Sequence, residues 1–136
     1  MSMVKMMRYD DLVGVPFVDG GRTGDGLDCW GLAMILLKRQ GYSVLDYPIR
    51  ATAVQEIAKA LKDGSECGSY EHLDSPKYGC IVLLRLSMDV WANHVGICIG
   101  HGRFIHAYSK TGVCIDRLSR WKSRIVGYYR PGRLES

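Results

Sequence analysis

The sequence lacks a long apolar run. Its longest uninterrupted apolar stretches, residues 32–37 and 81–84, are far shorter than the roughly 20 residues that a membrane-spanning helix needs. Residues 1–7 are slightly apolar, but this stretch is too short and too quickly charged for a secretory signal. We therefore expect a chain without a membrane span, synthesised in the cytoplasm without a signal peptide.

The sequence also lacks the cysteine pattern of a disulfide scaffold. Its cysteines are odd in number and occupy positions 29, 67, 80, 98 and 114. Cys80, Cys98 and Cys114 lie in apolar runs, where a free thiol packs as a small hydrophobe. A reducing compartment suits such thiols, and we expect neither a cofactor nor a metal.

A dense cluster of one charge sign is missing as well. The net charge is only +4, and the basic residues near the C-terminus are spread out, which predicts a solvated surface rather than a nucleic-acid site. There is no internal repeat and no obvious linker. The 136 residues therefore fit one domain, residues 1–136.

Apolar periodicity divides the chain into a helical part and a strand-rich part. After an irregular lead-in, apolar residues recur at helical spacing from Cys29 until Gly41, with Asp28 as the N-cap. A second helix is predicted over residues 52–63, followed by a loop over 65–78. Strands are predicted at residues 80–86, 94–99, 103–108, 113–116 and 125–130. Successive strands with short connections predict an α+β fold with an antiparallel sheet of about five strands.

Cys29 is the first candidate for chemistry. A thiolate is the nucleophilic form of cysteine, and unpaired N–H groups at a helix N-terminus favour it. Glycines just before Cys29 allow close approach of the backbone and leave room for a substrate. The alternative is that Cys29 is simply a buried first-turn residue.

Two histidines strengthen the catalytic interpretation. His94 opens one predicted strand and His106 lies in the next, across a short turn, so the two can be cross-strand neighbours on one face. A histidine near a cysteine can accept its proton, and a second polar residue can orient the first imidazole. The three residues together predict a nucleophile, a base and an orienting residue.

Several segments in order resemble the NlpC/P60 peptidases. The interval from His94 to His106 also matches the usual spacing of that family, and the likeness covers most of residues 9–130. The segments that carry it are Val15-Pro16-Phe17, Gly20-Gly21, Leu27-Asp28-Cys29-Trp30-Gly31-Leu32, Asn93-His94-Val95-Gly96-Ile97, Arg103-Phe104-Ile105-His106-Ala107 and Gly127-Tyr128-Tyr129-Arg130.

The resemblance implies a minimal papain-like fold in which the helix that bears the cysteine packs on the sheet. It implies that Cys29 is the nucleophile, His94 the base and His106 the orienting residue of a cysteine endopeptidase. The implied substrates are bacterial peptidoglycan stem peptides. Asp28 matches a family position that helps to bind the free amine of the substrate, and this role is compatible with capping.

The chain departs from the family at two positions near the nucleophile. Phe17 stands where many members carry Tyr, and Trp30 stands where many carry Ser. The Asp-Cys-Trp-Gly-Leu segment with Gly20-Gly21-Arg22 before it resembles the phage and prophage branch, which implies a tail-associated protein with phage tail proteins as partners.

Two alternatives follow from the same residues. One is a wall-binding or phage-tail structural module that keeps the fold without turnover, which Phe17 and Trp30 favour. The other is a zinc site built from nearby ligands, although no Cys-x-x-Cys pair supports it. Its candidate ligands are His94, Cys98, His101 and His106.

Overall fold

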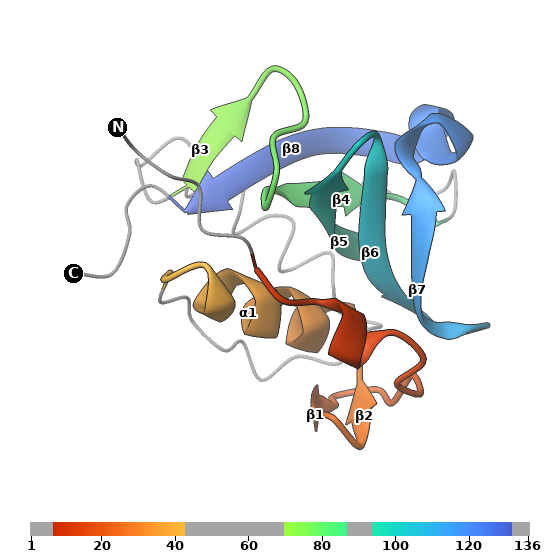
Figure 1. Cartoon of the computed structure of the whole chain (residues 1–136). Coiled ribbons are helices and arrows are strands. Elements are labelled where there is room, and N and C mark those ends of the chain that lie inside the picture. Colours follow the sequence, from red (N-terminus) through yellow and green to blue (C-terminus); the bar gives the residue numbers. More distant parts are fainter. Residues whose placement is uncertain (1–6, 43–69, 87–93, 132–136) are drawn as a thin grey trace.

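The structure is a computed structural model that describes residues 7–42, 70–86 and 94–131. A single α-helix in this part of the chain, α1 (Cys29–Arg39), lies against a six-stranded antiparallel sheet (Figure 1). The strand order of the sheet is β3-β8-β4-β5-β6-β7. The strands are β3 (Tyr70–Leu73), β4 (Ile81–Leu84), β5 (His94–Gly100), β6 (Arg103–Tyr108), β7 (Gly112–Arg117) and β8 (Ile125–Pro131). This is the predicted α+β arrangement of a helix on an antiparallel sheet.

Short elements precede α1 and connect the last two strands. A small hairpin of β1 (Arg22–Thr23) and β2 (Gly26–Leu27) directly precedes α1, and a 3-10 turn, η1 (Asp10–Leu12), precedes the hairpin. A second 3-10 segment, η3 (Leu118–Arg124), joins β7 to β8. The described residues contain no helix that is long and apolar enough to cross a membrane.

Helix α1 begins where the sequence places its cap. Asp28 has extended backbone geometry, and its carboxylate accepts a hydrogen bond of 2.7 Å from the backbone N–H of Gly31. Gly31 packs so closely against the β1–β2 segment that a Cβ there would overlap the carbonyl oxygen of Gly21. A side chain at this position would therefore push the start of the helix away from the hairpin.

The strand alternation gives the sheet two apolar faces. Val95, Ile97 and Ile105 belong to the core that α1 covers, which also contains Cys29. Residues of the opposite parity, such as Cys98 and Phe104, belong to a second cluster with Leu118 and half-buried Trp121. Strand β5 is accordingly buried along nearly its whole length, which explains its continuous apolar sequence.

Most predicted elements are confirmed within a residue or two. The predicted loop over residues 65–78 is wrong in part, because residues 70–73 form β3. This short strand pairs with the distant β8, Tyr70 opposite Pro131, and its burial pattern lacks the strict alternation that marks a strand in sequence. The predicted helix over residues 52–63 lies outside the described residues.

Candidate active site

Cys29 is the first residue of α1, and its side chain is almost completely buried, with 1% exposure. Its thiol receives a hydrogen bond from the backbone N–H of Val95 at the start of β5 and further support from its own N–H and that of Trp30. Burial outweighs these N–H groups, and it raises the pKa of the Cys29 thiol to about 12. In this arrangement the thiol is protonated at neutral pH.

His94, the residue directly before Val95, opens β5, and His106 lies in the middle of β6. Nε2 of His94 lies 2.8 Å from Nδ1 of His106, and both side chains are buried. The predicted neighbourhood of the two histidines is therefore confirmed. Gly96 makes it possible, because a Cβ there would lie only 2.8 Å from Cδ2 of Phe104 and 3.2 Å from Cβ of His106.

A third member of this chain of contacts, Asp116, was not singled out from the sequence. Its Oδ2 lies 2.8 Å from Nε2 of His106, and it comes from β7, the next strand of the sheet. The sequence carried no strong signal for it, since Asp116 stands beside Arg117 at the end of its strand, where a solvated carboxylate is common. Hydrogen bonds join Asp116 to His106 and His106 to His94, and we call these three residues the relay.

The relay defines which ring nitrogens carry protons. An ionised carboxylate only accepts hydrogen bonds, so Nε2–H of His106 donates to Asp116. Nδ1 of a neutral His106 then accepts, and Nε2–H of His94 donates to it. As a result the lone pair of His94 lies on Nδ1, the nitrogen that the relay leaves available to act as a base.

Both imidazoles are held in the neutral form. Burial, together with the charge of His106, lowers the pKa of His94 to about 3. Burial also lowers the pKa of His106, although its hydrogen bond to Asp116 works in the opposite direction. The resting site thus combines a neutral thiol with a neutral imidazole rather than an ion pair.

Aromatic side chains enclose the relay. Trp121, carried by η3, stacks on His94 with ring centroids 6.5 Å apart and meets His106 edge-on at 5.3 Å. Tyr108 lies beside both histidines, and Phe104 packs on His106. These rings surround the two imidazoles, and the low local dielectric strengthens the hydrogen bond between them.

The site thus has a cysteine at a helix N-terminus beside a strand that starts with histidine. The model of the NlpC/P60 family matches residues 14–130 of this chain. The chain belongs to the NlpC/P60 family.

Named relatives support this membership. The murein DD-endopeptidase MepS/murein LD-carboxypeptidase of Escherichia coli strain K12 is 32% identical over 121 residues, which cover 88% of this chain and 57% of that protein. The probable peptidoglycan endopeptidase LytE of Bacillus subtilis strain 168 is 34% identical over 121 residues, covering 88% of this chain and 31% of that protein. This chain therefore spans less than three-fifths of the length of either relative.

A solved structure shows the same fold. An NlpC/P60 family protein from Bacillus cereus ATCC 10987 matches with a TM-score of 0.63 at 22% identity, covering 96% of this chain and 42% of that one. The arrangement of helix and antiparallel sheet is thus an NlpC/P60 fold.

Asp28, the residue before Cys29 in this NlpC/P60 chain, uses its carboxylate within the protein. Besides Gly31, its Oδ1 accepts from Nη1 of Arg22 at 2.8 Å, and its Oδ2 accepts from the backbone N–H of Gly20 at 2.9 Å. The side chain is 1% exposed. The capping role is confirmed, whereas binding of a substrate amine stays a prediction.

Phe17, one of the departures from the NlpC/P60 pattern, is partly buried against the core that contains Cys29. It forms an isolated bridge with Leu27, two residues before the cysteine. The position therefore lies beside the segment that leads into α1. Trp30, the other departure and the second residue of α1, is fully buried.

The structure does not assemble the zinc ligands considered from the sequence. Cys98 shares a strand face with His94, but its Sγ lies 3.4 Å from Sγ of Cys80, and His101 sits in an exposed turn with a φ of 56°. The prediction that Cys80 and Cys98 are core residues is confirmed. Cys114 is only half-buried, and its Sγ lies 3.6 Å from Nε2 of His106, so its assignment to the core was wrong.

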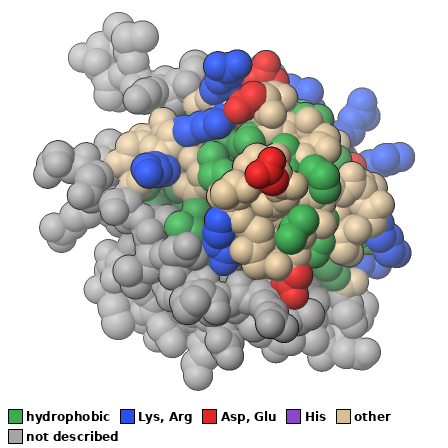
Figure 2. Space-filling view, turned by 90° about the horizontal axis from the view of Figure 1, so that it is seen from below, with side chains coloured by type: hydrophobic (Ala, Val, Ile, Leu, Met, Phe, Trp, Pro, Cys, Tyr) green, Lys and Arg blue, Asp and Glu red, His purple; other side chains and the backbone are tan. Residues whose placement is uncertain are grey.

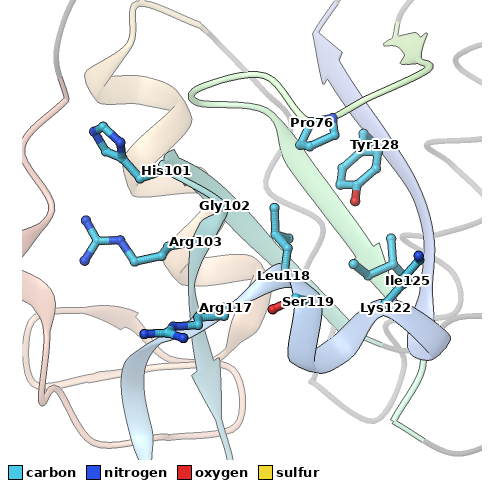
Figure 3. Close-up of a pocket in the computed structure, with 10 residues that line it drawn as sticks. All are labelled: Pro76, His101, Gly102, Arg103, Arg117, Leu118, Ser119, Lys122, Ile125 and Tyr128. Carbon is cyan, nitrogen blue, oxygen red and sulfur yellow. The ribbon is translucent and has the colours of Figure 1, made fainter.

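A cavity of about 690 Å³ opens at another place in the molecule, between the β5–β6 turn and η3 (Figure 3). Its lining combines apolar and aromatic residues such as Leu118 and Tyr128 with the basic residues Arg103, Arg117 and Lys122. Its lining includes neither Cys29 nor the two histidines. On the face below α1, acidic and basic side chains are interspersed rather than gathered by sign (Figure 2).

Proposed function

We propose that this protein is a cysteine endopeptidase that hydrolyses peptide bonds in bacterial peptidoglycan stem peptides, with Cys29 as nucleophile, His94 as base and His106 as the orienting residue. Membership of the NlpC/P60 family and the endopeptidase activities for which MepS and LytE are named support the reaction class. One observation carries the assignment of roles. The relay leaves the Nδ1 lone pair of His94 free, while the thiol of Cys29 lies against the N–H of the following residue.

In the proposed reaction, Nδ1 of His94 takes the thiol proton as Sγ of Cys29 attacks the scissile carbonyl carbon. The resulting oxyanion is stabilised by the backbone N–H of Cys29 at the start of the helix. His94 then gives its proton to the leaving amine, and the C–N bond breaks. Water, deprotonated by His94, hydrolyses the thioester and restores the thiol.

The neutral forms of Cys29 and His94 determine the step at which the thiol proton is transferred. Because the pKa of Cys29 is raised and that of His94 is lowered, a stored thiolate–imidazolium pair is disfavoured. Proton transfer therefore accompanies attack on the carbonyl. The relay assists at this moment, since the carboxylate of Asp116, acting through His106, stabilises the positive charge that develops on His94.

The test is digestion of purified peptidoglycan stem peptides, read by mass spectrometry. Wild-type protein should release fragments that identify the bond, and Cys29→Ala should release none. Cys80→Ala is the matched control, because that buried thiol lies on the other face of the sheet. Cleavage by Cys29→Ala at the wild-type rate would remove Cys29 from the reaction.

A second candidate function is a wall-binding or tail-structural module without turnover. The 1% exposure of Cys29, its raised pKa and the absence of a phenol at Phe17 favour this interpretation. Alkylation by a small thiol reagent separates the two candidates. A catalytic Cys29 reacts near neutral pH faster than the same residue in His94→Ala, whereas an idle Cys29 reacts equally slowly in both proteins.

We also propose that the protein is made in the cytoplasm and incorporated in a phage or prophage tail, where tail proteins are its partners. The support is the resemblance of Gly20-Gly21-Arg22 and of the segment around Trp30 to that branch of the family. Purified particles from an induced source strain should contain the protein by mass spectrometry. Its presence only in the particle-free lysate would contradict the assignment.

A further inference from the structure

Three groups that commonly bind metals meet at the outer end of the relay. Nε2 of His106, Sγ of Cys114 and the carboxylate of Asp116 all lie within 4.8 Å of one another. Cys114 is directly opposite His106 in the β6–β7 register, and Asp116 follows Cys114 by two residues on the same strand face. Two adjacent, well-paired strands thus hold all three ligand atoms.

Their separations are close to those of a tetrahedral zinc site. Bond lengths of about 2.0–2.3 Å imply separations of roughly 3.3–3.6 Å between neighbouring ligand atoms. The distance from Nε2 of His106 to Sγ of Cys114 is 3.6 Å, and that from Sγ to Oδ2 of Asp116 is 3.9 Å. Only the 2.8 Å hydrogen bond between Nε2 of His106 and Oδ2 of Asp116 has to open, by about half an ångström.

The surroundings allow an ion to enter. His106 is fully buried, but Asp116 has 26% of its side chain exposed and Cys114 is half-buried. The mixed set of one nitrogen, one sulfur and one oxygen suits zinc and leaves a fourth position for water. The thiol proton of Cys114 is released to solvent when the metal binds.

We propose that His106, Cys114 and Asp116 form a three-ligand site for Zn²⁺ that switches the relay off. A metal on Nε2 of His106 takes the place of the proton that Asp116 accepts, so the remaining proton of a neutral His106 lies on Nδ1. Nδ1–H then donates to Nε2 of His94, and the proton of His94 moves to its Nδ1. The base loses the lone pair that the reaction needs.

The site itself is independent of catalysis, whereas the loss of activity rests on the proposed peptidase function. Its first test uses Co²⁺ with metal-free protein from which any affinity tag has been removed. One equivalent should produce a thiolate-to-cobalt charge-transfer band, and Zn²⁺ should displace it. Cys114→Ser should abolish the band, and the matched variant Cys80→Ser should retain it.

The affinity change should be large. Loss of even an outer partner of a metal ligand typically costs about 10–100-fold in affinity, so loss of a direct ligand in Cys114→Ser or Asp116→Asn should cost at least about 100-fold. The absence of a charge-transfer band in wild type, or a band that survives Cys114→Ser and disappears in Cys80→Ser, overturns the site.

Imidazole ¹⁵N NMR tests the switch without an activity assay. Zinc should convert His94 from the Nε2–H to the Nδ1–H tautomer, and a chelator should reverse the change. An unchanged His94 tautomer in zinc-saturated protein refutes the switch. Peptide cleavage that one equivalent of zinc leaves intact also refutes it, while the proposed peptidase function survives. If metal-free protein cleaves nothing but shows the cobalt band and the tautomer change, the peptidase proposal fails and the metal site stands.

Discussion

Replacement of Asp116 by asparagine perturbs the relay at its outer end without changing the size of the side chain. In the wild type the carboxylate accepts from Nε2–H of His106 at 2.8 Å, and this bond makes one tautomer of both histidines strongly favoured. An amide has both a donor and an acceptor, so the side chain in Asp116→Asn can satisfy either tautomer of His106. The preference for a free lone pair on Nδ1 of His94 is then lost.

The size of the effect follows from the bond that is replaced. A hydrogen bond to a charged group contributes about 1.5–3 kcal/mol, and this free energy favours both the productive tautomer and the positive charge on His94 during catalysis. At about 1.4 kcal/mol per factor of ten, kcat/KM should fall roughly 10- to 150-fold. KM should change little, because Asp116 acts on the reaction through its hydrogen bond to His106.

The assay measures cleavage of a purified stem peptide under pseudo-first-order conditions, with the His94 tautomer read in parallel by NMR. Asp74→Asn serves as the matched control, since Asp74 is exposed and far along the chain from the relay. A fall of less than twofold in Asp116→Asn, with the His94 tautomer unchanged, would refute the reasoning. A larger fall in activity with an unchanged tautomer would assign the effect to charge alone.

Three further predictions concern stability, measured by urea unfolding. Burial lowers the pKa of His94 from 6.5 to about 3, so the contribution of the neutral imidazole to the free energy of unfolding is complete above pH 6.5 and is lost as pH falls toward 3. Near pH 4.5 the free energy of unfolding should be lower by the order of 2–3 kcal/mol, and His94→Gln should remove most of this pH dependence. Gly31→Ala should lower stability by about 1–3 kcal/mol through overlap with the hairpin, whereas Gly24→Ala, with open space around its Cβ, should be neutral or up to about 1 kcal/mol more stable. Arg103 and Arg117 are directly opposite each other in β6 and β7, so Arg117→Glu should raise stability by about 0.5–1 kcal/mol at low salt; an equal gain in high salt would show that charge is not the cause.

The strand-rich half of the fold was predictable because its pairs are local. The β5–β6 and β6–β7 hairpins have short turns, and their alternation alone places His94 and His106 on one face. Strand β3 was missed because its partner β8 is remote in sequence and its own pattern is weak. Asp116 was missed for a different reason, since a carboxylate at a strand end is typical of an ordinary solvated residue until its partner is known.

The same distinction between local and remote contacts separates the two halves of the candidate site. His94, His106 and Asp116 come from three consecutive strands, so the relay forms whenever this meander forms. Cys29 reaches β5 only through the core between α1 and the sheet, in which Val95 and Ile97 take part. Substitutions in that core should therefore misplace the thiol while the relay stays intact, and substitutions around Gly96 should do the reverse. The nucleophile and its base are thus held by separate parts of the fold, and the backbone N–H of Val95 is the point at which they meet.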